Sequence, residues 1–166
     1  MCPGSKEDCT IPRQRKSLVQ IYTDELMSQG RLEIADQILA DDVQFFGPGS
    51  GGPVRGHSPF KEFIVAIRTA FPDLHCEVHA IVEENDQVAC WLTVHGTHRA
   101  SWRGFQPTGR HLELQAMNLF RFSGDRIIEV RAFFNVADYD NVADYDTQLG
   151  KGAGPSFRVA PSGFAG

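Results

Sequence analysis

The sequence predicts one α+β domain, in which helices cover one face of a curved, mostly antiparallel sheet. Apolar residues recur at helical spacing up to Pro72, and beyond it they alternate with polar residues at the spacing of β-strands. The chain has 166 residues, of which 42% are hydrophobic. This length is ample for one buried core and too short for two full domains.

Three helices are expected before Pro72. Ser58 and Pro59 supply an N-cap and a first-position proline for the third helix, which ends at Pro72. A strand-like run at 43–46 precedes residues 47–56, whose five glycines and two prolines predict a flexible loop. The apolar stripes are Leu18, Ile21, Tyr22 and Leu26 in the first helix, Leu32, Ala35, Ile38 and Leu39 in the second, and Phe60, Phe63, Ile64, Ile67 and Phe71 in the third.

Four strands are expected beyond Pro72, at residues 75–84, 87–98, 111–122 and 126–134. Turn-forming residues at 84–86 and 123–125 join the first two and the last two of them as hairpins. Neighbouring strands are therefore antiparallel, and the helices bury their apolar stripes on one face of the sheet. A strongly bent sheet of this kind encloses a pocket.

The domain is expected to span residues 12–149, between flexible ends at 1–11 and 150–166. The hexapeptide Asn135–Asp140 is followed at once by an identical copy, Asn141–Asp146. A period of six residues does not keep the copies on one helical face, and the aspartates lack the glycine and the final glutamate of an EF-hand loop. We interpret the repeat as a duplicated, solvated segment.

Composition excludes several classes of function. The formal net charge is -5 and no block of Lys and Arg is long enough to follow a phosphate backbone, so no nucleic-acid partner is expected. No apolar run approaches the roughly 20 residues of a membrane span, and the N-terminus is charged where a signal peptide is apolar, which predicts a cytoplasmic protein without a membrane partner. No cysteine, histidine or glycine pattern has metal-ligand or dinucleotide spacing, so neither a metal nor an organic cofactor is expected. Cys76 and Cys90 are interpreted as small buried hydrophobic residues.

Three stretches of the chain resemble a known family. They are AFPDL at 70–74, GTH at 96–98 and QPTGR at 106–110, the last leading to NLFR at 118–121. Their order and spacing are similar to those of the SnoaL-like polyketide cyclases, or ester cyclases, of the NTF2-like superfamily. The resemblance covers roughly residues 15–135. It implies a cone-shaped α+β barrel whose curved sheet wraps the helices around an apolar pocket, and it implies a homodimer.

The resemblance also implies where acid–base chemistry would lie. In aldol-type cyclases of this family, an aspartate in the last strand is the acid/base and a histidine on the preceding strand lies beside it; these positions correspond here to Ala132 and Asn118. Relatives similar to limonene epoxide hydrolase use an Arg-Asp pair where this chain has Arg131 followed by Ala132. A second motif of those relatives, Arg-x-Asp, corresponds here to positions near Leu92 and Val94. Neither set of acid–base residues is matched.

Strand alternation predicts which residues line the pocket. They are Ile128, Val130, Ala132 and Phe134 of the last strand, Leu112, Leu114, Ala116, Asn118 and Phe120 of the strand before it, and Cys90, Leu92 and Val94 of the strand from Gln87. Glu129 and Arg131 then face outward. Asn118 is the strongly polar group on these walls. Its amide either satisfies a buried backbone group or donates to a carbonyl or enolate oxygen of a substrate.

Four further side chains are candidates for the site. Tyr22 either packs in the first apolar stripe or points its hydroxyl into the pocket. His57 opens the third helix, and His98 ends the GTH stretch; each is either a site residue or structural. Trp102 either caps the open mouth of the cone or covers its edge.

We therefore expect a small cofactor-free cyclase or isomerase of secondary metabolism that acts on an apolar polyketide-like or terpenoid substrate. Since an alanine cannot act as a base, the candidate catalytic residues are Asn118, His98, His57 and Tyr22. The candidate substrate-binding residues are Leu114, Ala116, Val130, Ala132, Phe134 and Trp102. Two alternatives stay open: a non-catalytic module for apolar-ligand binding or dimerisation, and an epoxide-hydrolase-like enzyme.

Overall fold

The computed structural model describes residues 14–47, 52–102 and 106–134, the side chain of Phe134 excepted. The helices are α1 (Arg15–Ile21), its π-helical continuation η1 (Tyr22–Ser28), α2 (Glu33–Ile38) and α3 (His57–Ala70). The strands are β1 (Leu39–Phe46), β2 (Val54–Arg55), β3 (His75–Glu84), β4 (Gln87–Thr97), β5 (His111–Ser123) and β6 (Arg126–Phe134). In this part of the chain, no helix is both long and apolar enough to span a bilayer.

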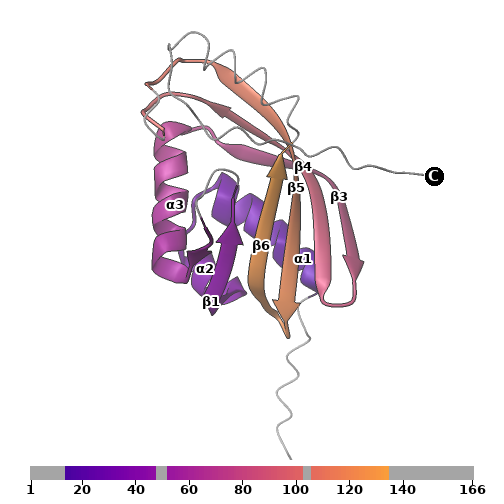
Figure 1. The fold of residues 1–166 in the computed structure, drawn as a ribbon. Coiled ribbons are helices and arrows are strands. Elements are labelled where there is room, and N and C mark those ends of the chain that lie inside the picture. Colours follow the sequence, from indigo (N-terminus) through magenta and orange to yellow (C-terminus); the bar gives the residue numbers. More distant parts are fainter. Residues whose placement is uncertain (1–13, 48–51, 103–105, 135–166) are drawn as a thin grey trace, which may run out of the picture.

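The strands form one curved sheet that is not closed, in the order β2-β1-β6-β5-β4-β3 (Figure 1). Strands β3 to β6 pair with their sequence neighbours in antiparallel fashion, as predicted. Strand β6 also pairs with β1, and this pairing is parallel. The α+β class and the mostly antiparallel sheet are confirmed.

Two predictions for the region before α3 were wrong. Residues 47–56 are not loop throughout, because Val54 and Arg55 form β2 and pair with Phe45 and Gln44 of β1; residues 48–51 lie outside the described ranges. The strand predicted at 43–46 begins four residues earlier, at Leu39. Leu39 therefore belongs to the sheet rather than to the second helix.

The start of α3 also differs from the prediction. Gly56 is the N-cap and helical residues begin at His57, so Ser58 and Pro59 lie inside the first turn. Gly56 has φ 81°, in the left-handed region where a glycine is favoured because it has no Cβ. The predicted end of the helix is confirmed, with Ala70 as its last residue.

The helices cover the inner face of the sheet, as expected (Figure 1). The main core joins η1 and α3 to β4, β5 and β6 through fully buried side chains. Its largest members include Tyr22, Leu26, Phe60, Ile64, Leu92, Phe120 and Ile127. The tandem hexapeptide and both ends predicted to be flexible lie outside the described residues.

The AFPDL and GTH stretches meet at one corner of the fold. The Asp73 carboxylate accepts hydrogen bonds from the backbone N–H of Thr97 at 2.6 Å and from its hydroxyl at 2.7 Å. These donors hold the pKa of Asp73 below its ordinary value. The rings of Phe71 and His98 stack with centroids 5.2 Å apart. A Cβ on Gly96 would lie 3.1 Å from the Cβ of Phe71, tighter than ordinary contact, so a larger residue there would need Phe71 to shift.

Candidate active site

The inner face of the sheet places Asn118 of β5 between two small residues. Asn118 pairs with Cys90 of β4 on one side and with Ala132 of β6 on the other. This register confirms the predicted juxtaposition of Asn118 and Ala132. The residues two positions away on the same face, Ala116 and Phe120, are buried. An amide is thus set into an apolar wall.

The side-chain oxygen of Asn118 is buried and accepts no hydrogen bond from any described residue. Leaving a buried acceptor unpaired costs about 1–3 kcal/mol, and buried polar groups in native proteins nearly always have a partner. The described residues therefore do not support the interpretation that this oxygen accepts a hydrogen bond from a buried backbone group. A donor on a bound molecule would complete its hydrogen bonding.

Tyr22 of η1 brings a phenol into the same interior. Its ring meets the ring of Phe120 edge-on at 5.0 Å and lies 6.1 Å from the ring of Phe60 in α3. Burial raises the pKa of the Tyr22 hydroxyl well above its ordinary value, with a smaller contribution from Cys76. The hydroxyl stays protonated, so it is suited to donate a hydrogen bond and not to act as a base. The ring packs in the core, as one of the two interpretations of Tyr22 expected.

The apolar residues predicted to line the pocket lie on this inner face, with one exception. Ala116 and Val130 are buried, and Leu114 and Ala132 are half-buried. The side chain of Phe134 lies outside the described residues; its backbone pairs with Ala116. Ala116 and Val130 belong to the main apolar core, and Ala132 packs against it.

The exception is Ile128, which was predicted to face inward. A β-bulge between Arg121 and Phe122 shifts the register, so that Phe122 pairs with Ile127 while Arg121 pairs with Glu129. The extra residue reverses the alternation in β6. Ile127 is therefore buried in the core, and Ile128 faces away from the helices.

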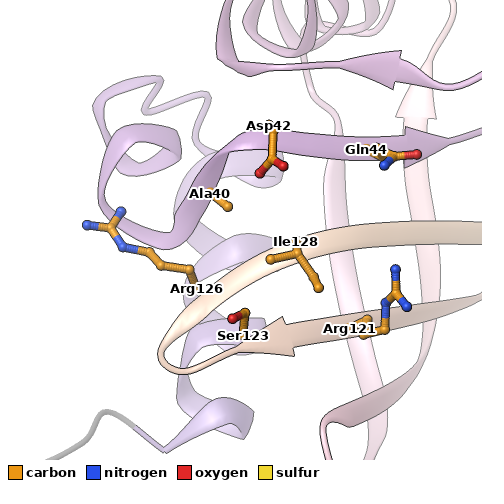
Figure 2. Close-up of a pocket in the computed structure, with 7 residues that line it drawn as sticks. All are labelled: Ala40, Asp42, Gln44, Arg121, Ser123, Arg126 and Ile128. Carbon is orange, nitrogen blue, oxygen red and sulfur yellow. The ribbon is translucent and has the colours of Figure 1, made fainter.

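Ile128 lines a hollow of about 470 Å³ on the outer face (Figure 2). Its other lining residues are Ala40, Asp42 and Gln44 of β1, Arg121 and Ser123 of β5, and Arg126 of β6. Both signs of charge are present, and Arg121 is already paired with Glu129 at 3.0 Å. This polar hollow does not suit the apolar substrate expected from the sequence.

His57 joins the start of α3 to α2 and β1. Its Nδ1 lies 3.0 Å from the Asp36 carboxylate, and its Nε2 lies 2.9 Å from the backbone oxygen of Ala40. Lys61 binds the same carboxylate at 2.7 Å, and Lys61 and His57 together lower the pKa of Asp36. Both nitrogens of His57 thus face acceptors within the fold, and the ring links three elements.

His98 and Trp102 lie with a second buried cluster, formed by the end of α3 and the residues after it. The His98 ring is buried, and its Nδ1 lies 3.3 Å from the Thr108 hydroxyl. Trp102 packs against Phe63 and Phe71, with ring centroids 6.2 and 6.3 Å apart. The predictions that Trp102 caps the mouth of the cone or covers its edge both stay open.

The structure does not bring His98 to Asn118. His98 follows Cys90, the strand partner of Asn118, by eight residues. At about 3.3 Å per residue this is roughly 26 Å of strand. Tyr22 contacts Phe120, which lies two residues from Asn118 on the same face, so Asn118 and Tyr22 are taken together as one candidate site. His98 and Trp102 lie toward another end of the same layer.

The comparisons with known proteins agree with the fold. Residues 17–143 match the family model of the SnoaL-like polyketide cyclases. The chain belongs to this family. No curated protein matches the sequence.

Solved structures with the same fold include other proteins proposed to be SnoaL-like cyclases. One from Jannaschia sp. CCS1 has a TM-score of 0.71 and 19% identity, covering 82% of this chain and 96% of that chain. IdmH from Streptomyces antibioticus, proposed to be a polyketide cyclase, has a TM-score of 0.65 and 26% identity, covering 76% of this chain and 99% of its own. AclR from Streptomyces galilaeus, proposed to be a hydroxylase, has a TM-score of 0.65 and 24% identity, covering 79% and 96%.

Within the described residues, this SnoaL-like chain has no buried carboxylate; the polar residues buried as a whole are Thr23, Thr93 and His98, while Asn118 is half-buried with a buried oxygen. Burial raises the pKa of the Cys76 thiol to about 12 and that of the Cys90 thiol to about 11. Neither cysteine is therefore a thiolate at neutral pH. Cys90 is the buried hydrophobic residue that was expected, while Cys76 is half-buried. The charge of Asp24 also raises the pKa of Cys90, so a carboxylate lies within electrostatic reach of the residue that flanks Asn118.

Proposed function

We propose that this SnoaL-like chain is a cofactor-free cyclase or isomerase of secondary metabolism, located in the cytoplasm, that binds an apolar polyketide-like or terpenoid substrate on the inner face of its sheet. The buried, unpaired amide oxygen of Asn118 carries the proposal. The half-buried and buried apolar residues beside it would contact the hydrocarbon part of the substrate. These are Leu114, Ala116, Val130 and Ala132, and Phe134 is proposed with them from its place on the same strand.

Asn118 would hold and polarise one oxygen-bearing unit of the substrate. The amide nitrogen donates to a carbonyl or to the enolate oxygen that develops from it, and the amide oxygen accepts from a hydroxyl or enol. A donor directed at a developing oxyanion contributes about 100- to 1,000-fold in rate. The protonated hydroxyl of Tyr22 is the second donor in this proposal.

The expected catalysis depends on substrate conformation more than on a strong base. Ala132 stands where the aldol-type cyclases of the family have their acid/base aspartate, and no carboxylate is buried in the described part of the chain. Holding the two reacting ends of a flexible chain together lowers the entropy cost of ring closure. His98 and Trp102 would then contact the far end of an extended substrate, and His57 would act by positioning α3.

The lack of a buried carboxylate in the described residues favours the binding module and weakens the epoxide-hydrolase alternative. A pocket without a carboxylate is also what a non-catalytic module for an apolar ligand would have. An epoxide-hydrolase-like enzyme needs an acidic group in the pocket to activate water, and the described residues bury none.

The variant Asn118→Ala tests the proposal. The full chain is incubated with linear poly-β-keto thioesters and with acyclic terpenoid ketones. Products are followed by mass spectrometry, and binding is measured by calorimetry. We expect turnover of an accepted substrate to fall by about 100-fold or more. The melting temperature should change little, because the substitution removes an unpaired polar group and leaves no partner exposed.

Gln115→Ala is the matched control, because Gln115 is exposed on the same strand. It should keep both turnover and binding. Tight binding by the wild type without any product would favour the binding module. A loss of several kcal/mol in stability with unchanged binding would make Asn118 a structural core residue and contradict the site.

We also propose a homodimer that forms through the outer face of the sheet. Trp91, Met117 and Phe133 are 45%, 43% and 53% exposed and lie in one row, since Trp91 pairs with Met117 and Met117 pairs with Phe133. A two-fold axis through Met117 along β5 would place Trp91 against the partner's Phe133. The row is therefore self-complementary, as an isologous interface requires.

A further inference from the structure

A cluster of metal-ligating side chains lies across β4 and β5, away from Asn118. His95, His111 and Glu113 each offer a ligand atom, and these atoms lie within 4.8 Å of one another. The strand register creates the cluster, because His95 pairs with Glu113 and Thr97 pairs with His111. The residues come from two strands, so no spacing along one segment of the sequence reveals them.

Hydrogen bonding assigns the tautomer of His95. Its Nε2 lies 3.1 Å from the Glu77 carboxylate, which is a hydrogen-bond acceptor, so Nε2 carries the proton. The lone pair is then on Nδ1, which lies 3.8 Å from the Glu113 carboxylate. A carboxylate behind a histidine is the arrangement that orients metal-binding imidazoles in proteins. The His75 ring stacks on His95 with centroids 4.6 Å apart and restricts its rotation further.

The tautomer of His111 follows from a chain of two hydrogen bonds. The Thr97 hydroxyl uses its proton to donate a hydrogen bond to Asp73 at 2.7 Å. Its oxygen therefore acts as an acceptor toward Nδ1 of His111, which lies 3.2 Å away. Nδ1 of His111 therefore carries the proton, and Nε2 has the lone pair. Each histidine thus has one nitrogen held by the protein and one left for a ligand.

The spacing suits one divalent metal ion. Two ligand atoms bound to zinc at about 2.1 Å in tetrahedral geometry are roughly 3.4 Å apart. The 3.8 Å between His95 Nδ1 and the Glu113 oxygen is close to that separation and too long for a hydrogen bond. His111 and Glu113 are exposed, so small side-chain rotations would complete the geometry without moving the backbone.

We propose that His95, His111 and Glu113 form a surface binding site for a divalent first-row transition metal such as Zn²⁺. Two imidazoles and one carboxylate are a ligand set that zinc and its neighbours in the first row accept, with a further position for water. Glu77 and the Asp73–Thr97 pair act as positioning residues behind the two imidazoles. The site lies apart from Asn118 and is independent of the function proposed above.

Calorimetric titration of the full chain, freed of metal by a chelator, with Zn²⁺ and in parallel with Ni²⁺ tests the site. The wild type should bind one ion more tightly than His111→Ala and Glu113→Ala do, by at least about tenfold. Glu77→Ala should weaken the same binding by about 10- to 100-fold although Glu77 touches no metal. With Co²⁺, the wild type should show a ligand-field absorption band that His111→Ala lacks.

His79→Ala is the control, because His79 lies on the same strand as Glu77 but bonds to the Thr93 hydroxyl at 2.7 Å and takes no part in the cluster. It should bind Zn²⁺ as the wild type does. Melting curves without metal identify any variant that fails to fold, and the exposed Glu113 gives a second variant that decides in that case. Equal affinity and stoichiometry in the wild type, in His111→Ala and in Glu113→Ala would overturn the proposal.

Discussion

The neighbours of Asn118 matter as much as its amide. Cys90 and Ala132 flank it on the adjacent strands, and neither side chain provides a donor that reaches the amide oxygen. A larger residue at either position would fill the space beside the amide. The pairing of one polar residue with two small ones is therefore what makes this position a candidate for contact with a substrate.

The variant Ala132→Asp tests whether water reaches residue 132 on the inner face of the sheet. Beside the buried Val130, the charged form of the new carboxylate is disfavoured, so its pKa should rise above the ordinary value of about 3.9. The folded protein then binds the proton more tightly than the unfolded chain, and stability falls as the pH rises through the raised pKa. We expect the loss in melting temperature relative to the wild type to be larger at about pH 8 than at about pH 5.

Ala132→Asn is the control for this experiment, because it has the same shape without the titration. Its loss in melting temperature should be the same at both pH values. A loss for Ala132→Asp that does not depend on pH would contradict a dry wall and show that water reaches residue 132.

Some of the helices and strands could be predicted from the sequence, and others could not. Strands β3 to β6 could be predicted almost to the residue, because two-residue alternation and turn residues at Asn85 and Gly124 are local signals. Ile128 could not be placed, because the bulge at Arg121 and Phe122 depends on how two strands pair. β2 was missed because Val54 and Arg55 lie in a glycine-rich stretch and become a strand only through pairing with β1.

The family resemblance was carried by structural residues, which explains why it predicted the fold better than the site. Asp73 binds Thr97, and Phe71 stacks on His98, so the AFPDL and GTH stretches hold one corner together. These residues identify the architecture and say little about the reaction. Asn118 was indicated by the position of the family's histidine and by strand alternation, but its unpaired oxygen became visible only in three dimensions.

Gly96→Ala tests this corner. The new methyl group would lie 3.1 Å from the Cβ and 3.3 Å from the Cδ1 of Phe71, tighter than ordinary contact. We expect a loss of about 1–3 kcal/mol in the free energy of unfolding, measured by chemical denaturation. Gly52→Ala is the matched control and should be neutral, since a Cβ there meets nothing within 4 Å. An unchanged stability for Gly96→Ala would mean that Phe71 can shift at little cost in free energy.

At the scale of the molecule, the two faces of the sheet differ in what they offer. The inner face is covered by helices and carries Asn118 in an apolar layer. The outer face carries the row of Trp91, Met117 and Phe133. Substrate binding and self-association are therefore proposed for opposite faces, so each can be tested without disturbing the other.

Met117→Lys tests the homodimer. In the proposed interface Met117 lies on the two-fold axis, so the variant would bring two ammonium groups together and should be monomeric. The wild type should sediment as a dimer in analytical ultracentrifugation. Val65→Lys introduces the same charge at a residue of α3 that is 50% exposed, and it should leave the dimer intact. A monomeric wild type, or a dimeric Met117→Lys, would contradict the interface.

Removal of residues 150–166 tests the predicted domain boundary. Five glycines and two prolines leave this segment few side chains able to bury apolar area. We expect the shortened chain to melt within a few degrees of the full chain in a calorimetric scan. A large drop would show that the tail packs on the domain, and a loss of activity at constant stability would place it over the substrate.

The position of β6 between β1 and β5 has a consequence for how the protein is made. Strand β1 leaves the ribosome early, yet one of its two partners in the sheet is the last of the described strands. Until residues 126–134 emerge, the edges of β1 and β5 that β6 will later occupy stay open to other chains. Folding during synthesis therefore cannot complete the sheet before residue 134 has emerged, and until then the growing chain carries two open strand edges that favour aggregation. A chain terminated before β6 should aggregate, whereas one terminated after the domain should not.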